Sequence, residues 1–246
     1  MRVLVIPDVH LKPWIFDRAE SLLKTGKADR AVCLMDVPDD WDREFQVPLY
    51  EQTFDRIIAF SRTFPETLWC YGNHDVSYLW GRLESGYSPY AERTVISKLE
   101  EFRNGLEDPG RLAFVHRLGK VIFSHGGLSK PYVLKLNPYL FHADVDEVIA
   151  AVNSASPDRL WSDDSPLWLR PQFENCYLFG QDEYVQVVGH TPVEAISEKG
   201  GVISTDVFST YRNGVQIGPS HMVVIESETG TYETVPVDGA PENRGT

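Results

Sequence analysis

Cysteine is scarce in this chain of 246 residues. Cys33, Cys70 and Cys176 are odd in number and widely spaced, which argues against a zinc ribbon or a redox pair. Cys33 and Cys70 lie within apolar runs, where cysteine usually acts as a small hydrophobic residue. This usage fits a reducing compartment, so we expect a cytoplasmic location.

Positive charge is also scarce, because 36 acidic residues oppose 23 Lys and Arg residues and give a formal net charge of −13. Proteins that track nucleic-acid backbones usually carry a basic surface, so nucleic acid is not an expected partner. No apolar run approaches the ~20 residues that span a bilayer. Residues 1–6 are strand-like rather than a basic, cleavable signal, and no membrane partner is expected.

Linker-like segments are absent as well, since no Gly/Ser tract, proline run or charge block divides the chain. The length suffices for one well-buried core. We therefore predict a single domain over residues 1–237, followed by a flexible polar tail over residues 238–246.

Strand-like and helix-like stretches alternate in the first half. Strands are expected at residues 2–7, 30–34 and 67–71, with helices at 14–24 and within 48–64. This order predicts parallel strands joined by right-handed crossovers. Further helices are expected near residues 90–102 and 143–152, and a hairpin is expected from residues 112–116 and 120–124.

The last quarter of the chain is mostly β. Strands are expected at residues 185–188, 202–205, 221–226 and 232–236. Residues 154–183 are irregular, aromatic and rich in Pro and Asp, and are expected to lie over the site as loops. Together these patterns predict an α/β fold of two packed mixed β-sheets flanked by helices.

Five short segments each end a hydrophobic run with residues that can bind metal. Ligands in open α/β sheets gather at the carboxyl ends of strands, so these side chains are expected to converge on one metal centre. The segments are Asp8-Val9-His10, Asp36-Val37-Pro38-Asp39, Gly72-Asn73-His74-Asp75, Ser124-His125-Gly126-Gly127 and Gly189-His190-Thr191-Pro192.

Each segment alone also fits a structural role. Asp8 and His10 lie on the same side of an extended backbone and can reach one ion, but such a pair also forms Asx turns. Asp36 either bridges two cations or caps a helix. Gly-Asn-His-Asp also suits a tight turn, and His125 and His190 taken singly also fit structural histidines. The ordered occurrence of all five favours the metal centre.

In this order the segments resemble the pattern of the calcineurin-like metallophosphoesterase superfamily. That pattern is Asp-x-His, Gly-Asp-x-x-Asp, Gly-Asn-His-Asp/Glu, a His segment, and Gly-His-x-His or Gly-His-x-Pro. The match runs from Asp8 to Pro192. The resemblance implies an αββα sandwich and a metal-dependent phosphoric ester hydrolase.

The resemblance further implies a centre of two divalent metal ions. The implied ligands are Asp8, His10 and Asp36 for the first ion, and Asp36, Asn73, His125 and His190 for the second. The superfamily uses Mn, Fe, Zn, Ni or Mg, and mixed oxygen and nitrogen ligands suit several of these ions. Manganese is one expectation among these.

A mechanism follows from that resemblance. Two metal ions hold the phosphate and generate a hydroxide that attacks phosphorus. His74 is then the general acid for the leaving oxygen, and Asp39 orients it. Asp39 also fits a helix cap or a solvated loop acid.

Three positions depart from the pattern. Met35 stands where the superfamily usually has Gly, and Pro192 stands in place of the second His of Gly-His-x-His. The Gly-His-Thr-Pro form is similar to the phosphoprotein-phosphatase branch and its diadenosine tetraphosphatase relatives. Asp40 stands where that branch carries a phosphate-binding Arg.

Two further residues gain roles from the same resemblance. Arg170 follows Leu160-Trp161-Ser162-Asp163, a segment similar to one in Ser/Thr phosphatases, and is the candidate for substrate binding or else a surface Arg. Asp206 follows an expected strand in a region similar to Asp-Thr-Gly of bacterial members. It is expected to orient a metal-bound histidine rather than to bind metal.

Three functions are compatible with these features. The favoured hypothesis is a phosphatase that acts on phosphomonoesters, whose substrate is a small molecule, a nucleotide or a phosphoprotein. The second is a phosphodiesterase or dinucleoside polyphosphate hydrolase that uses the same metals. The third is a non-catalytic scaffold of the same fold that works by protein binding, which the full set of implied ligands and His74 disfavours.

Overall fold

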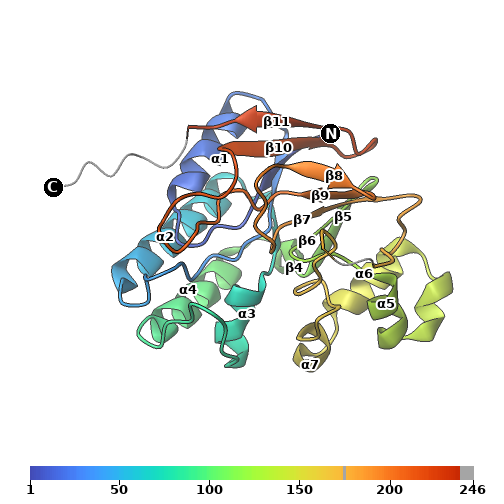
Figure 1. Ribbon diagram of the computed structural model, residues 1–246, viewed down its shortest axis with the longest axis horizontal. Helices are drawn as coiled ribbons and strands as arrows, with labels where there is room; N and C mark the ends of the chain where they lie inside the picture. Colours follow the sequence, from blue (N-terminus) through green and yellow to red (C-terminus); the bar gives the residue numbers. More distant parts are fainter. Residues whose placement is uncertain (174–175, 239–246) are drawn as a thin grey trace.

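Two β-sheets lie between two groups of helices in the computed structural model, which describes residues 1–173 and 176–238 (Figure 1). The first sheet has the order β11 (Tyr232–Pro236), β10 (His221–Glu226), β1 (Arg2–Ile6), β2 (Arg30–Cys33), β3 (Leu68–Cys70), β4 (Leu112–Ala113). The second has the order β5 (Val115–Leu118), β6 (Val121–Ser124), β7 (Val185–Val188), β9 (Val202–Ser204), β8 (Ser197–Lys199). Both sheets contain parallel and antiparallel pairs, so the predicted α/β fold of two mixed sheets is confirmed.

Helices cover the outer face of each sheet (Figure 1). On the first sheet lie α1 (Trp14–Lys24), α2 (Val47–Thr63) and α4 (Glu92–Gly105). On the second lie α5 (Lys130–Leu136) and α6 (Val145–Asn153). The remaining helices are α3 (Asn73–Trp80), α7 (Pro157–Leu160) and two 3-10 turns, Pro109–Arg111 and Pro138–His142.

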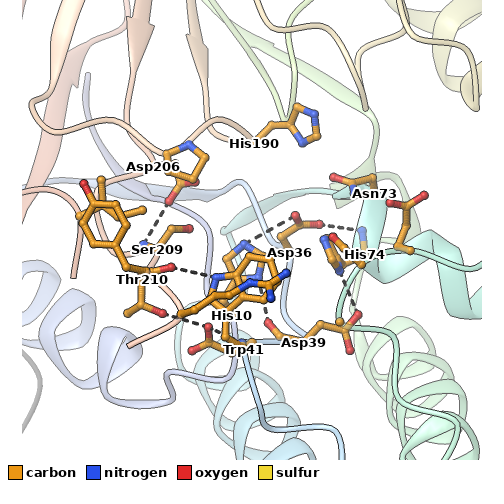
Figure 2. Close-up of a pocket in the computed structure, with 18 of the residues that line it drawn as sticks. His10, Asp36, Asp39, Trp41, Asn73, His74, His190, Asp206, Ser209 and Thr210 are labelled. Atoms are coloured by element: carbon orange, nitrogen blue, oxygen red, sulfur yellow. Dashed lines mark hydrogen bonds and ion pairs between the residues drawn. The ribbon is translucent and has the colours of Figure 1, made fainter. Parts of the chain in front are cut away.

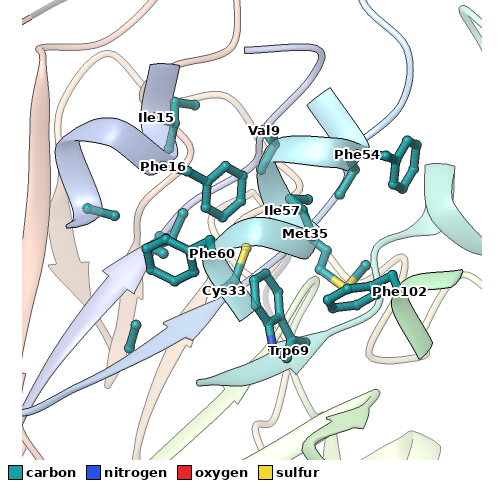
Figure 3. Packing of buried hydrophobic residues seen from close by; sticks show 14 of the residues in the cluster. Val9, Ile15, Phe16, Cys33, Met35, Phe54, Ile57, Phe60, Trp69 and Phe102 are labelled. Carbon is teal, nitrogen blue, oxygen red and sulfur yellow. The ribbon is translucent and has the colours of Figure 1, made fainter. Parts of the chain in front are cut away.

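Strand β1 shows how the two faces of the first sheet are filled. Its alternate residues Val3 and Val5 contribute to the core between the sheets, whereas Leu4 and Ile6 pack against the helices. All four are fully buried, which is why the strand is an unbroken apolar run. Figure 3 shows the helix side of this core, where aromatic rings fill the space between sheet and helices.

The parallel pairs set the position of the site. β1, β2 and β3 are parallel neighbours, with Val5 opposite Val32 and Val32 opposite Leu68, so their carboxyl ends lie side by side. In the second sheet β6 and β7 are likewise parallel neighbours. The segments that follow these five strands carry the candidate ligands.

The predicted hairpin is only partly correct. Leu112 and Ala113 pair with β3 in the first sheet, and the hairpin partner of β6 begins at Val115. The chain therefore crosses from one sheet to the other at Phe114. The apolar run from Leu112 to Val115 continues across this point and gives no sign of the crossing. The Asn153 side chain accepts hydrogen bonds from the N–H groups of Phe114 and Val115 at this point.

Several described elements were not predicted, among them α3, α5 and β8. The Gly-Asn-His-Asp segment opens α3 directly, and β8 adds an exposed edge strand to the second sheet. Within the described part of 154–183, the elements are the short helix α7 and otherwise loops, as expected. The single domain over residues 1–237 stays a prediction, and residues 239–246 of the predicted tail lie outside the described residues.

Cys33 and Cys70 are fully buried in the sandwich, as expected for small hydrophobic residues. Among the described residues, every helix is too short or too polar to cross a bilayer. The cytoplasmic location stays a prediction.

The buried His116 on β5 makes stability depend on pH. Its Nε2 lies 3.1 Å from the carbonyl oxygens of Trp69 and Arg111, and burial lowers its pKa to about 4. An unfolded histidine binds its proton near pH 6.5, so the unfolded state gains more protons as pH falls. The contribution of neutral His116 to the unfolding free energy is complete above the pKa of the unfolded histidine. It is lost as the pH falls from 6.5 to 4. Relative to His116→Gln, the wild type should lose about 2 kcal/mol of unfolding free energy between pH 7 and pH 5.

Urea denaturation at the two pH values measures this difference. His142→Gln is the matched control, because His142 is exposed on a 3-10 turn and should give the wild-type pH dependence. Equal pH dependence in wild type and His116→Gln would contradict the assignment of a neutral buried His116.

Candidate functional site

The five segments singled out in the sequence converge on one buried place at the carboxyl ends of their strands. Asp8 and His10 follow β1, Asp36 follows β2, and Asn73 follows β3. His125 follows β6 and His190 follows β7, so the second sheet supplies these two imidazoles. Figure 2 shows His10, Asp36, Asn73, His74 and His190 around one pocket. The structure thus brings together all six predicted metal-ligand side chains.

Asp36 lies at the centre of the cluster. One of its carboxylate oxygens, Oδ2, lies 3.1 Å from His125 Nε2 and 3.9 Å from His10 Nε2. The other oxygen, Oδ1, accepts a hydrogen bond from the backbone N–H of His74 at 2.9 Å. The same carboxylate therefore faces histidines from both sheets.

The backbone at these strand ends is in the left-handed region. Its φ is +54° at Met35, +45° at Asp36, +68° at Asp39, +41° at His10 and +62° at His190. This conformation is costly for residues other than glycine, and such residues cluster at functional sites. The positive φ at Met35 also explains why the superfamily pattern usually has glycine at this position.

Asp75 holds the Asp36 loop in place, a role that was not predicted. Its buried carboxylate accepts the backbone N–H groups of Asp36, Val37 and Gly72 at 2.9 to 3.0 Å. The sequence signal was the acidic residue that ends Gly-Asn-His-Asp. Because it occupies the third position of α3, it faces back toward the start of the helix.

Two glycines leave room for the carboxylates. A Cβ atom on Gly72 would lie 2.0 Å from Asp36 Oδ1, and one on Gly189 would lie 2.0 Å from Asp8 Oδ2. Each glycine directly precedes a candidate ligand, Asn73 or His190. Close approach of backbone and carboxylate therefore requires glycine at both positions.

The ligand atoms form two groups that share Asp36. Asp8, His10 and Asp36 form one, and Asp36, His125 and His190 form the other, with the ligand atoms of each group within 4.8 Å of one another. Asn73 Oδ1 lies 3.0 Å from His125 Nε2, next to the second group. Asp8 Oδ2 and His190 Nε2 are buried, and neither has a hydrogen-bond partner among the residues that the structure describes. Buried polar atoms are normally paired, so these two fit metal ligation.

The charges of the cluster also fit bound cations. Burial raises the pKa of Asp8 well above its usual range, and the nearby Asp206 carboxylate raises it further. Burial also opposes the charge on Asp36, but the His125 and His74 charges hold its pKa below the usual range. A divalent cation would supply the positive charge that these buried carboxylates need.

His74 and Asp39 form the predicted dyad. His74 Nδ1 lies 2.9 Å from Asp39 Oδ2, and the Asp39 carbonyl oxygen lies 3.0 Å from His10 Nδ1. Burial lowers the pKa of His74, but the Asp36 charge and the Asp39 hydrogen bond outweigh it and raise the pKa to about 9. The dyad thus keeps Nδ1 of His74 tied to Asp39.

Two tyrosines that were not predicted complete the dyad. The hydroxyls of Tyr50 and Tyr78 donate to Asp39 Oδ1 at 3.2 and 2.6 Å. Tyr50 comes from α2 and Tyr78 from α3, and no local sequence signal marked either residue. Both Asp39 oxygens are therefore occupied, and the helix-cap alternative for this residue finds no support.

The cluster opens into a cavity of about 400 Å³. Arg170 lines it and donates Nη1–H to the His190 carbonyl at 3.2 Å and to Thr191 Oγ1 at 3.1 Å. Asp206 also lines it, with one oxygen accepting the Ser209 N–H and the other, Oδ2, unpaired (Figure 2). Asp206 belongs to neither ligand group among the described residues. Trp41, Glu84 and Arg212 are lining residues that the sequence did not indicate.

Asp40, which stands at the unusual position, is paired. It lies 2.9 Å from Lys12 Nζ through Oδ2 and accepts the Thr210 hydroxyl through Oδ1 at 3.0 Å. Lys12 in turn donates to the His10 carbonyl at 3.0 Å. Asp40 therefore joins the loops that follow β1 and β9.

The fold and the clustered candidate ligands at the strand ends fit a metal-dependent phosphoric ester hydrolase. A family model for the calcineurin-like phosphoesterases matches residues 1–218. The chain belongs to this family. The resemblance seen in the five segments is thereby confirmed, and with it the enzyme class.

Solved structures of similar fold include phosphatases. The cold-active protein-tyrosine phosphatase of a psychrophilic Shewanella species has a TM-score of 0.57 and 21% identity, covering 95% of this chain and 80% of that one. A single-substitution mutant of a cold-active protein tyrosine phosphatase has a TM-score of 0.52 and 19% identity, with the same coverage. No curated protein sequence matches the chain. At this identity the likeness shows the fold.

The fit of Gly72 against Asp36 yields a prediction. Gly72→Ala places a methyl group where Asp36 Oδ1 lies, so the carboxylate must move. The affinity for Mn²⁺, measured by titration calorimetry on metal-free protein, should fall by about 10–100-fold, as for lost supporting contacts of metal ligands. Gly105→Ala is the control, because a Cβ there meets no atom within 4 Å. Wild-type affinity in Gly72→Ala would rule out this packing constraint.

Proposed function

We propose that the chain is a phosphatase that hydrolyses phosphomonoesters with two divalent metal ions. The observation that carries the proposal is the pair of buried ligand groups that share Asp36. A carboxylate has two oxygens and can bridge two cations, and two bridged ions suit a clamp on a phosphate. The family membership sets the reaction class, and the count of ions is part of the proposal.

The ligand assignment follows the two groups. Asp8, His10 and Asp36 hold the first ion, and Asp36, Asn73, His125 and His190 hold the second. The unpaired Asp8 Oδ2 and His190 Nε2 support it, as does the placement of His125 Nε2 3.0 to 3.1 Å from oxygens of Asn73 and Asp36. When bound, the ions neutralise phosphate charge and activate the water that attacks phosphorus.

Hydrogen bonds to backbone carbonyl groups orient two of the proposed histidine ligands. His125 Nδ1 lies 3.0 Å from the Leu34 carbonyl oxygen, and its donated hydrogen bond leaves Nε2 to face Asn73 and Asp36. His10 Nδ1 donates to the Asp39 carbonyl, which leaves its Nε2 toward Asp36. Asp206 stays close enough to influence the charge of Asp8 and His10 without belonging to either group. Its side chain bonds the Ser209 backbone, and its role in orienting a metal-bound histidine stays a prediction.

His74 donates the proton that the leaving oxygen needs. Its Nδ1 is held by Asp39, so Nε2 is the nitrogen left to face the substrate. Asp39 is fixed in turn by Tyr50 and Tyr78, which keeps the ring from turning away. Arg170 also lines the cavity. Its Nη1 donates to His190 and Thr191, and its other N–H groups bind the phosphate oxygens.

The cavity supports a monoester as the substrate. Its volume of about 400 Å³ lies at the small end of ligand pockets, which run from roughly 300 to 1,000 Å³. A structure of similar fold is a protein-tyrosine phosphatase, whose phosphotyrosine substrate is a monoester. The natural substrate is a phosphorylated small molecule, nucleotide or protein.

A groove beside the cavity favours a second candidate, a phosphodiesterase or dinucleoside polyphosphate hydrolase. The groove has a volume of about 800 Å³ and shares Asp40, Trp41, Thr210 and Arg212 with the cavity. A substrate with groups on both sides of the reacting phosphorus would extend into it. We rank it second because the ligand groups face the smaller cavity.

Turnover of two model substrates tests both functions. Purified protein with Mn²⁺ should hydrolyse p-nitrophenyl phosphate faster than its bis ester, and chelator should abolish both rates. Asp36→Asn serves as the metal-site control, with lost activity and reduced metal content by elemental analysis. Faster bis-ester hydrolysis would reverse the ranking, and no metal-dependent turnover of either ester would refute the phosphatase proposal.

Replacement of His74 separates proton donation from metal binding. In His74→Asn, turnover of a monoester with a poor alcohol leaving group should fall by about 10²–10⁴-fold. Turnover of p-nitrophenyl phosphate should fall less, because that leaving group needs little protonation. Metal content should stay at the wild-type value. The exposed His142→Asn is the control. Equal losses on both esters would argue against His74 as the proton donor.

A further inference from the structure

The loop between α3 and α4 is built onto the His74–Asp39 dyad. Tyr78, which donates to Asp39, accepts the Ser88 backbone N–H at 2.8 Å and stacks on Tyr87 at 4.2 Å between ring centroids. Gly86 has φ +82°, and a Cβ there would lie 3.3 Å from Asp39 Cβ. The loop thus has a fixed position relative to the dyad.

This loop places the carboxylate of Glu84 at the edge of the cavity. The Tyr87 backbone N–H donates to the Glu84 carbonyl oxygen at 3.1 Å, which closes a turn around Glu84. Glu84 lines the cavity together with Ser85 and Gly86. Its side chain is half-buried and forms no ion pair with any residue that the structure describes.

Glu84 is the half-buried acidic residue without an ion pair among those described in the cavity, and the other acidic residues differ from it. Asp36, Asp39 and Asp206 are at most 2% exposed, and Asp40 is paired with Lys12. Burial raises the pKa of Glu84, whereas the charge of the nearby His74 lowers it. The Glu84 carboxylate accepts a backbone hydrogen bond from Ser85 but forms no ion pair with a described residue, so next to the reacting phosphate it favours a substrate group that carries positive charge.

The leaving group of the substrate lies on the side of Glu84. A proton donor must be next to the leaving oxygen, so the leaving group lies by His74. Gly86, two residues after Glu84, lies against Asp39, whose carboxylate is 2.9 Å from His74 Nδ1, so Glu84 and His74 lie on the same side of the cavity. Figure 2 shows Ser209 and Thr210 on the other side, where Arg212 stacks over Trp41 at 4.8 Å.

We propose that Glu84 is a specificity residue that selects phosphomonoesters whose leaving alcohol carries an ammonium group, and that disfavours alcohols carrying a carboxylate. This inference rests on the proposed monoesterase function and on His74 as the proton donor. The contact is with the bound alcohol before reaction, so its effect falls mainly on KM rather than on kcat.

Three esters of similar size test the charge preference. They are 2-aminoethyl phosphate, n-propyl phosphate and phosphoglycolate, whose leaving groups are cationic, neutral and anionic. Relative to n-propyl phosphate, wild-type kcat/KM should be about fivefold higher for the ammonium ester and about fivefold lower for the carboxylate ester, as for a partly exposed charge pair. In Glu84→Gln both ratios should approach one through changes in KM. Glu100→Gln, which replaces an exposed acid on α4, should keep the wild-type ratios.

The outcomes separate this inference from the function on which it rests. If wild type hydrolyses none of the three esters nor p-nitrophenyl phosphate, the proposed function fails, and the inference fails with it. If it hydrolyses them with equal ratios in wild type and Glu84→Gln, only the inference is overturned. A preference for phosphoglycolate would also overturn it and would point to Arg212 instead.

Discussion

The carboxylate of Asp75 is the interaction on which the site depends. It accepts three backbone N–H groups, two from the loop after β2 and one from the end of β3. These bonds hold Met35 and Asp36 in a left-handed conformation that they would otherwise avoid. Burial and the nearby Asp36 charge raise the pKa of Asp75 to about 7, so ordering this loop carries an electrostatic cost. Since both ligand groups share Asp36, both depend on this support.

The sequence was informative wherever the physical signal is local. Each of the five segments follows a strand-like apolar run, and the polar residues mark the strand ends, so the candidate ligands from Asp8 to His190 were singled out, and their role as ligands stays a prediction. The crossing of the chain from the first sheet to the second at Phe114 was missed, because apolar residues are expected in strands of either sheet. Tyr50 and Tyr78 were missed because no local pattern links them to Asp39, and only tertiary packing brings their hydroxyls to its carboxylate.

The dyad and the rim of the cavity form one unit. Tyr78 bonds Asp39 through its hydroxyl and carries the loop of Glu84 through its contacts with Tyr87 and Ser88. The same side chain therefore supports a residue proposed for proton transfer and a residue proposed for leaving-group selection. Loss of the Tyr78 hydroxyl is therefore expected to change reactivity and preference together, whereas Glu84→Gln leaves this hydroxyl in place and changes preference alone. The loop after β9 has no such link to His74 and is tied instead to Asp40.

The distribution of ligands between the two sheets has a consequence for assembly. Asp8, His10, Asp36 and Asn73 follow strands of the first sheet, whereas His125 and His190 follow strands of the second. The second ligand group therefore exists only after the sheets have docked through the core that includes Val5, Phe123 and Val187. An ion bound to the proposed second group would join residues of both sheets, and its binding energy would add to the stability of the contact between them. Loss of metal would loosen the contact between the sheets before it loosened either sheet.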